Sequence, residues 1–264
     1  MWPSATVDSV MKQQEINLDF SRRQVMTIVN VTPDSFFAGS RTPDWLDVER
    51  RVRDAVEAGA SVIDVGGYSS RSGADEVSPE EEWRRVDLGV GAVRTIHKYG
   101  KVIINDISAG ELDPLIVDVV AEHDVPYVAM HMKGDPRTMQ SMTDYRDIVA
   151  EVVDYFRERT AQLRERGVRR IVVDPGFGFA KTLEQNYELL RGLHSLAELG
   201  YPVLAGVSRK SMIYKLLGTT PAEALNGTTA LHWECLRQGA VILRAHDTRE
   251  AVEVVRMFDQ FMQA

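Results

Sequence analysis

The sequence predicts an α/β protein built as a TIM-type (β/α) barrel. Short, almost continuously apolar runs alternate with longer segments of helical period, and polar side chains follow every apolar run. Alternation of strands and helices along a whole chain is typical of a barrel or a doubly wound sheet. A doubly wound sheet concentrates its ligand groups at one switch point, whereas a barrel draws them from nearly all strand ends. The polar strand ends therefore favour the barrel.

Seven apolar runs are predicted as parallel strands, which read as continuous hydrophobic stretches when helices cover them. They span residues 24–31, 61–67, 101–107, 126–132, 170–176, 202–208 and 240–246. Helices are predicted over residues 45–60, 78–100, 144–167 and 248–261. Several helical segments end in glycine just before a strand, as in "EAGA" and "KYG", which is a common helix C-cap. A complete (β/α)₈ barrel has eight units, so one unit fewer than expected is visible.

The composition is that of an ordinary globular protein, with 44% apolar and 27% charged residues in 264. We expect one barrel domain over residues 1–264, with residues 1–23 as an N-terminal extension. The net charge is −8 and no basic stripe is present, which argues against a nucleic-acid partner. No apolar run approaches the length of a membrane span and no signal peptide is recognisable, so a cytoplasmic location is expected.

The single cysteine and the histidines give no catalytic or zinc pattern. Cys235 lies in the middle of a predicted helix, which indicates a buried structural thiol in a reducing compartment rather than a nucleophile. The six histidines form no i, i+4 pair and have no cysteine neighbours, so a dedicated zinc site is not expected.

The first predicted strand ends in unusual polar residues. In "TIVNVTPDSFFAGS", residues 27–40, Asn30 interrupts the apolar run, and Thr32, Asp34 and Ser35 follow it. A buried polar group without a partner costs about 1–3 kcal/mol, so these side chains are expected to meet a ligand.

Cationic and hydroxyl groups follow three other strands. "GGYSSRSG" carries Arg71, "GVSRKS" carries Ser208, Arg209 and Lys210, and the last strand carries Arg244 with His246. A solvated surface arginine is the ordinary explanation of any one of them. Together at one barrel mouth, in a chain of net negative charge, they indicate a bound anionic group.

A second group combines an amide, a carboxylate and an ammonium, in Asn105, Asp174 and Lys210. Such a set can pair with the edge of a flat heterocycle, although a buried Asp174–Lys210 ion pair is the alternative. The turn "DPGFGFAKT" resembles a phosphate-binding loop only weakly, because Ala180 replaces the required glycine. Lys181 in this turn is expected to be an exposed surface lysine.

Seven motifs in register resemble the dihydropteroate synthase family, from about residue 24 to the C-terminus. They are "NVTPDSF", "IDVGGYSSRSGA", "INDIS", "MHMKGDPRTMQ", "DPGFGFAKT", "GVSRKS" and "LRAHD". The resemblance implies a (β/α)₈ barrel, usually a homodimer. It also implies condensation of 6-hydroxymethyl-7,8-dihydropterin diphosphate with 4-aminobenzoate, releasing diphosphate.

The resemblance also implies roles for individual residues. Asn30 resembles a magnesium- and diphosphate-associated asparagine, so Mg²⁺ is the expected cofactor. Asp34 lies in a first mobile loop and Ser70 in a second. Catalytic roles are implied for Asn30, Asp34, Arg71, Lys210 and Arg244. Substrate-binding roles are implied for Ser70, Arg71, Asn105, Met132, Asp174, Phe179, Gly206, Ser208, Lys210, Ser211, Arg244 and His246. Of these, Arg71, Arg244 and His246 resemble diphosphate ligands. Asn105, Asp174 and Lys210 resemble pterin ligands. Met132 and Phe179 resemble apolar walls of the site, and Ser211 is implied to lie near the aminobenzoate.

The sequence departs from the family pattern between "RTIHKYG" and "KVIINDIS". Other members carry a third strand and helix there, and an aspartate of that strand contacts the pterin. Smaller departures are Tyr68 for glutamate, Ser70 for threonine, Ser72 for proline and Ala180 for glycine. Two alternatives therefore stay open: a methyltransferase-type pterin-binding barrel, and a catalytically impaired or non-catalytic relative.

Overall fold

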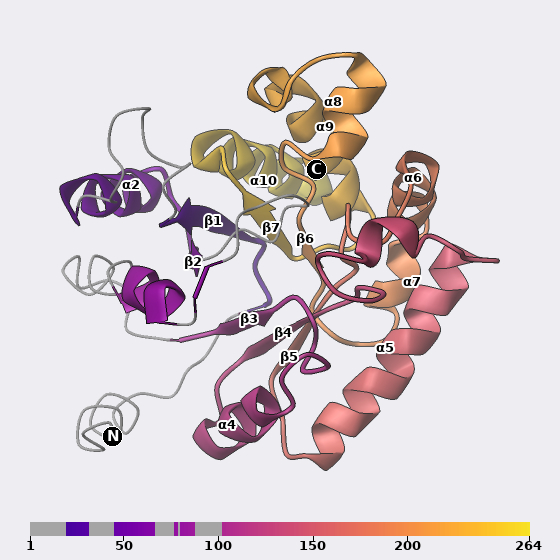
Figure 1. Cartoon of the computed structure of the whole chain (residues 1–264). Coiled ribbons are helices and arrows are strands. Elements are labelled where there is room, and N and C mark those ends of the chain that lie inside the picture. The colour runs from indigo at the N-terminus through magenta and orange to yellow at the C-terminus, as the bar shows by residue number, and fades with distance from the viewer. Residues whose placement is uncertain (1–19, 32–44, 67–76, 79, 88–101) are drawn as a thin grey trace.

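The computed structural model describes residues 20–31, 45–66, 77–78, 80–87 and 102–264 of the chain (Figure 1). Asp34, Ser70 and Arg71, which the sequence assigns to the site, lie outside these described residues.

The described residues form seven strands, at the seven positions predicted. They are β1 (Gln24–Asn30), β2 (Val62–Gly66), β3 (Ile104–Asp106), β4 (Tyr127–Met130), β5 (Ile171–Asp174), β6 (Leu204–Ala205) and β7 (Ile242–Ala245). Every pairing between them is parallel. Six of the seven residues of β1 are buried, as expected for a strand covered on both faces.

Helices surround the strands on the outside (Figure 1). They are α2 (Trp45–Glu57), α4 (Leu115–His123), α5 (Ile148–Glu165), α6 (Leu183–Arg191), α7 (His194–Ala197), α8 (Ser211–Leu217), α9 (Leu225–Arg237) and α10 (Thr248–Gln263), with 3-10 turns η2 (Met139–Ser141) and η3 (Pro221–Glu223). Residues 80–87 are also helical. Helix α6 begins with a capping box, in which Thr182 and Gln185 satisfy each other's backbone N–H groups.

The strands are hydrogen-bonded as two sheets, in the orders β2-β1-β7-β6 and β3-β4-β5. A parallel bridge between Val173 and Val203 joins them between β5 and β6. Among the described residues this leaves β2 and β3 as the two strands that are paired on one side only. The sequence predicts that a strand–helix unit is missing between β2 and β3; residues 67–76 and 88–101, which connect these strands, lie outside the described residues.

The barrel interior is filled by one buried apolar side chain from each of six strands. These six residues form a single cluster, against which Phe20, Ile103 and Val241 pack: Met26, Val62, Val128, Val172, Leu204 and Ile242. Residues from β2 and β4 thus meet inside the structure although no ladder connects them. Interior layers filled by bulky side chains from different strands are the core arrangement of a (β/α) barrel. The predicted fold class is confirmed.

A larger core lies between the strands and the outer helices. It includes Val25 of β1, Phe156 of α5 and Phe258 of α10, all buried. Cys235 on α9 belongs to this core and is fully buried, and burial raises the pKa of its thiol, as expected for a structural cysteine. No helix in the described part of the chain is long and apolar enough to cross a membrane.

Candidate active site

A ring of polar side chains lies directly above the apolar cluster of the barrel interior. Side chains two residues apart on a strand point to the same face. The residues two positions beyond Val62, Ile103, Val172 and Ile242 are therefore interior too. We call them the polar layer: Asp64, Asn105, Asp174 and Arg244. Two carboxylates, an amide and a guanidinium inside a barrel are costly to bury and indicate a binding function.

Asp64 connects two members of the polar layer on different sheets. Its Oδ2 accepts hydrogen bonds from Arg244 Nε at 2.7 Å and forms an ion pair with Arg244 Nη2 at 2.6 Å. Its Oδ1 accepts a hydrogen bond from Asn105 Nδ2 at 3.4 Å. Because Asn105 is on β3 and Asp64 is on β2, this contact crosses the opening between the two unpaired strand edges.

The polar-layer residue Asp174 interacts electrostatically with Lys210, which follows β6. Asp174 is buried and accepts a hydrogen bond from the Gly176 N–H at 2.8 Å. Burial raises the pKa of Asp174, against the opposing charges of Lys210 and Arg244. Burial lowers the pKa of Lys210 to about 8, against the attraction of Asp174. Lys210 donates to the Phe177 carbonyl, and its ammonium lies over the Phe179 ring. Among the described side chains Lys210 and Asp174 form no direct ion pair, although the charge of each partly offsets the effect of burial on the pKa of the other.

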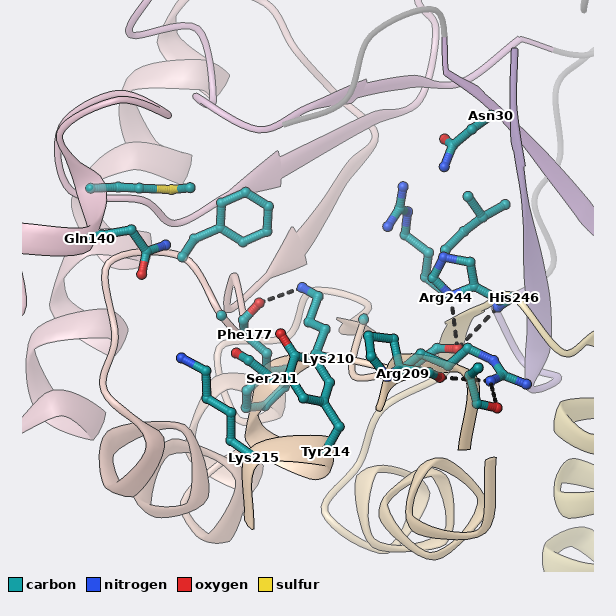
Figure 2. Close-up of a pocket in the computed structure, with 18 residues that line it drawn as sticks. Asn30, Gln140, Phe177, Arg209, Lys210, Ser211, Tyr214, Lys215, Arg244 and His246 are labelled. Atoms are coloured by element: carbon teal, nitrogen blue, oxygen red, sulfur yellow. Dashed lines mark hydrogen bonds between the residues drawn. The ribbon is translucent and has the colours of Figure 1, made fainter. Parts of the chain in front are cut away.

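A cavity of about 600 Å³ opens at the carboxyl ends of the strands (Figure 2). Eight of the predicted site residues line it: Asn30, Phe179, Gly206, Ser208, Lys210, Ser211, Arg244 and His246. They come from β1, the turn after β5, the turn after β6, the start of α8, and β7. Side chains more than 200 residues apart in the chain thus converge on one space, as predicted.

Three other predicted residues do not line this cavity. Asp174 and Met132 are buried, and Asn105 is connected to the cavity-lining Arg244 through Asp64. Met132 packs in a small cluster with Met130, Met139 and Phe179, so it supports the wall that Phe179 presents. The assignment of individual roles to these residues stays a prediction.

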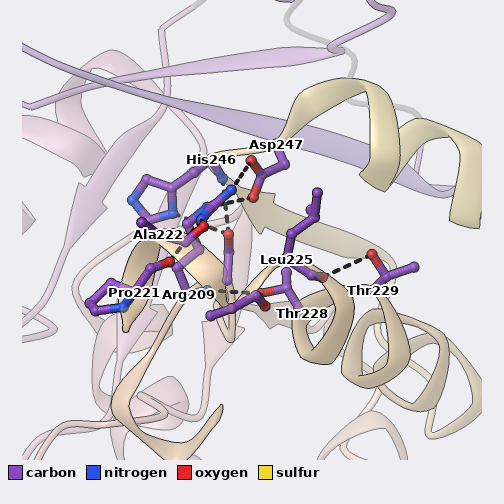
Figure 3. A network of polar contacts seen from close by, with 10 residues as sticks. Arg209, Pro221, Ala222, Leu225, Thr228, Thr229, His246 and Asp247 are labelled. Carbon is purple, nitrogen blue, oxygen red and sulfur yellow. Dashed lines mark hydrogen bonds and ion pairs between the residues drawn. The ribbon is translucent and has the colours of Figure 1, made fainter. Parts of the chain in front are cut away.

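Hydrogen bonds at the end of β7 organise the side of the cavity that carries Ser208 and His246. Ser208 Oγ lies 3.1 Å from His246 Nδ1 and also accepts a hydrogen bond from the His246 N–H at 3.1 Å. Arg209 also lines the cavity, and its guanidinium forms a bidentate pair with Asp247, with both contacts at 2.8 Å (Figure 3). Arg209 also donates to the carbonyls of Pro221 and Ala222, which anchors η3 at the cavity rim.

Helix α8 contributes two residues that we did not predict from the sequence, Tyr214 and Lys215, in addition to the predicted Ser211. Ser211, Tyr214 and Lys215 all line the cavity, at the i, i+3 and i+4 positions of the helix (Figure 2). This spacing was available as a signal, because the helix begins at the predicted residue Ser211. Gln140, after β4, also lines the cavity and borders a smaller pocket together with Ser211 and Lys215. Asp64, on β2, is not among the site residues predicted from the sequence.

The prediction that Lys181 is an exposed lysine is wrong. Lys181 is only 5% exposed, and its Nζ donates to the Gly176 and Phe179 carbonyls at 3.0 and 2.9 Å. The same ammonium lies 3.1 Å from His131 Nδ1. Burial lowers the pKa of Lys181 to about 7. The turn of residues 176–180 folds back over the side chain, and sequence periodicity does not reveal this because the turn has no regular period.

Asn30 is the predicted metal ligand within the described residues. Its backbone carbonyl accepts a hydrogen bond from Arg51 at 3.2 Å, while its side-chain amide borders the cavity and makes no hydrogen bond to another described residue. No group of three or more His, Cys, Asp or Glu side chains within the described ranges is arranged to hold a metal ion. Magnesium commonly binds through one or two protein oxygens together with substrate phosphates, so a single amide oxygen here fits it.

Comparison with known proteins gives a consistent result. The model of the family described as pterin binding enzyme matches residues 26–246. Dihydropteroate synthase of Escherichia coli K12 is 40% identical over 271 residues, covering 95% of this chain and 96% of the relative. The aligned length exceeds the whole of this 264-residue chain, so the relative has positions without a counterpart here.

Solved structures of dihydropteroate synthases have the same fold. The Yersinia pestis enzyme in a sulfonamide drug complex matches with a TM-score of 0.85 and 34% identity, over 95% of this chain and 98% of its own. The Xanthomonas albilineans enzyme with 4-aminobenzoic acid matches with a TM-score of 0.82 and 35% identity, over 93% and 95% of the two chains. With a family model matching most of the chain and relatives this similar, the chain belongs to the pterin-binding enzyme family.

Proposed function

We propose that this chain catalyses the dihydropteroate synthase reaction of folate biosynthesis, with the cavity above the polar layer as its active site. The reaction condenses 6-hydroxymethyl-7,8-dihydropterin diphosphate with 4-aminobenzoate and releases diphosphate. The observation that carries the proposal is the convergence of Lys210, Arg244, His246 and Ser208 on one cavity directly above Asp64, Asn105 and Asp174. The cations and the hydroxyl can bind an anionic leaving group, and the carboxylates and the amide can bind the edge of a polar heterocycle.

The chemistry needs stabilisation of negative charge on the leaving diphosphate. Arg244 and His246 provide N–H donors at the end of β7, and Ser208 holds the His246 ring in place at 3.1 Å. Preorganised donors of this kind stabilise charge as it develops and do not need to reorient during the reaction. Magnesium, when bound at Asn30, would neutralise further charge on the diphosphate oxygens.

The heterocycle is expected to bind deeper in the barrel. Asp174 accepts from ring N–H groups, and Asn105 and Lys210 complete the set with amide and ammonium donors. The Phe179 ring, which already contacts the Lys210 ammonium at 4.7 Å, forms an apolar wall. Burial shifts the pKa of Asp174 upward and that of Lys210 downward, as is frequent for ionisable groups in a binding site.

The amine of 4-aminobenzoate then attacks the fixed methylene carbon of the pterin as the C–O bond breaks. Ser211 and Lys215 on α8 supply a hydroxyl and a cation toward the benzoate carboxylate. The arylamine attacks in its neutral form, so positioning of the two substrates contributes most and no strong general base is required.

The two alternative functions are less well supported. A methyltransferase-type barrel would not require Ser208, Arg244 and His246 together on an anion-binding side. An impaired relative is favoured only by the absent strand–helix unit, and the polar layer is connected across that opening by Asp64 and Asn105. We also propose a homodimer, supported by the exposed apolar residues Met257, Phe261 and Met262 on α10. The single Cys235, buried and unpaired with another cysteine, fits a reducing compartment and supports a cytoplasmic location as a further proposal. Sedimentation of the full chain would test the dimer.

Calorimetry with pterin diphosphate followed by a turnover assay with 4-aminobenzoate tests the proposed function. Wild-type protein is expected to bind the pterin diphosphate and to form dihydropteroate. Arg244→Ala is expected to lower kcat/KM by roughly 100-fold or more, because loss of one preorganised donor typically costs that much. Arg170→Ala, which removes an arginine that pairs with Asp124 away from the cavity, is the control. Unimpaired turnover in Arg244→Ala would contradict the assignment of the site.

A further inference from the structure

Asp64 has a position that the proposed reaction does not itself explain. It does not line the cavity, and its side chain is only 13% exposed, yet both of its oxygens contact members of the polar layer. Arg244, by contrast, lines the cavity with its side chain 26% exposed. A buried carboxylate that holds a cavity-lining arginine acts on ligands through that arginine.

The geometry of the pair is restrictive. Arg244 directs Nε and Nη2 at the same oxygen, Oδ2 of Asp64, at 2.7 and 2.6 Å. One edge of the planar guanidinium is therefore fixed, and the remaining N–H groups are held in a defined plane. A free arginine side chain loses rotamer entropy on binding a ligand. The pair with Asp64 removes much of this cost before the ligand arrives.

The second contact of Asp64, with Asn105, joins strands β2 and β3. Strands β2 and β3 are unpaired on their facing sides in the described structure, so no backbone ladder holds Asn105 in register with Arg244. The hydrogen bond from Asn105 to Asp64 connects the two sheets at the level of the polar layer. A chain of contacts thus runs from Asn105 through Asp64 to Arg244.

We propose that Asp64 is a positioning residue, which fixes Arg244 and Asn105 relative to each other across the opening between β2 and β3. It thereby aligns the anion-binding side with the heterocycle-binding side. The inference rests on the proposed function for its kinetic readout. Asp64 takes no part in bond making or breaking, and its effect passes through the two side chains that it holds.

The test is a double-mutant cycle of Asp64→Asn and Arg244→Met. Asp64→Asn keeps the shape of the side chain but removes the charge that fixes the guanidinium. We expect kcat to fall at least tenfold while KM for pterin diphosphate changes less than threefold, because an unpaired Arg244 still attracts the anion but is poorly oriented. In the Arg244→Met background the same Asp64 substitution is expected to change kcat less than threefold.

Asp124→Asn is the matched control, because Asp124 pairs with Arg170 at 3.1 Å far from the cavity. It is expected to leave kcat unchanged in both backgrounds. Rates are normalised to folded protein by thermal unfolding, and Asp64→Ser, which also removes the carboxylate, takes the place of Asp64→Asn in the cycle if that variant folds poorly. Equal effects of Asp64→Asn in the two backgrounds, or wild-type kcat in that variant, would overturn the proposal.

Calorimetric binding of inorganic diphosphate gives a readout that needs no turnover. Asp64→Asn is expected to raise the diphosphate Kd by about two- to threefold in the presence of Arg244, which agrees with the small change expected in KM, and to leave the Kd unchanged in Arg244→Met. An inactive wild-type enzyme would contradict the proposed function, and this binding cycle would still decide whether Asp64 acts through Arg244. Diphosphate binding that is identical in Asp64→Asn and wild type would then overturn the positioning role.

Discussion

Lys181 shows how a single side chain organises a turn. Its ammonium is surrounded by two backbone carbonyls and the Nδ1 atom of His131, all at hydrogen-bonding distance. These contacts stabilise the turn after β5. The Phe177 carbonyl of this turn accepts a hydrogen bond from Lys210, so Lys181 helps to position Lys210. Burial nevertheless penalises its charge and lowers its pKa from 10.5 to about 7.

This shift predicts a pH dependence of stability. Between about pH 7 and 10.5 the unfolded chain binds a proton at Lys181 that the folded protein does not. The free energy of unfolding of the wild type should therefore rise with pH across this window, relative to Lys181→Met, by up to about 1.4 kcal/mol per pH unit. Urea unfolding at several pH values measures it. Lys215→Met, at an exposed lysine, is the control, and parallel curves for wild type and Lys181→Met would contradict the prediction.

At the scale of an element, the turn after β5 depends on Gly176. Its φ is +68°, and an added Cβ would lie 2.1 Å from the His131 carbonyl oxygen. That oxygen belongs to the backbone directly after β4, which cannot move aside without disturbing the β4–β5 ladder. The turn and the adjacent ladder are therefore one rigid unit that carries Asp174, Phe177 and Phe179 to the site.

Gly176→Ala is expected to destabilise the protein by about 3 kcal/mol or more, because both the backbone conformation and the close contact are unfavourable. Gly200→Ala is the matched control. Gly200 has a φ of +81° but nothing lies within 4 Å of its added Cβ, so only the conformational cost of about 1 kcal/mol should appear. Equal losses in chemical denaturation would show that the contact with His131 is unimportant.

At the scale of the whole molecule, the barrel has seven strands in its described part and two strand edges without a partner ladder. The interior remains filled across this opening, since Val62 of β2 and Val128 of β4 belong to the same buried cluster. Side-chain packing and the Asp64–Asn105 contact connect the two edges, between which the described residues form no ladder.

Restoring a strand at this position should stabilise the fold. The graft inserts, between Gly100 and Lys101, the third strand–helix unit of a dihydropteroate synthase that has a complete barrel. We predict that it raises the free energy of unfolding by about 2–5 kcal/mol, because each new ladder hydrogen bond contributes about 1 kcal/mol. A Gly/Ser linker of equal length is the control and should be neutral or slightly destabilising. Equal stability of graft and linker in denaturant unfolding would contradict the prediction.

The sequence by itself determined the elements and the order of their chemistry. Continuous apolar runs, helix-ending glycines and polar strand ends depend on local periodicity, so the seven strands and the residues at their carboxyl ends were predictable. Even the polar layer follows from the two-residue period of strands, once the apolar layer beneath it is known.

Only the tertiary structure decided which of these groups meet. Asp64 and Arg244 are 180 residues apart, and their contact depends on the stagger of strands around the barrel, which no local pattern specifies. The burial of Lys181 depends on a turn folding back on itself, and the cavity-facing side of α8 depends on how that helix packs. The local sequence determines which segments form strands and helices and which side chains lie at their ends. Long-range packing determines which of these side chains contact one another.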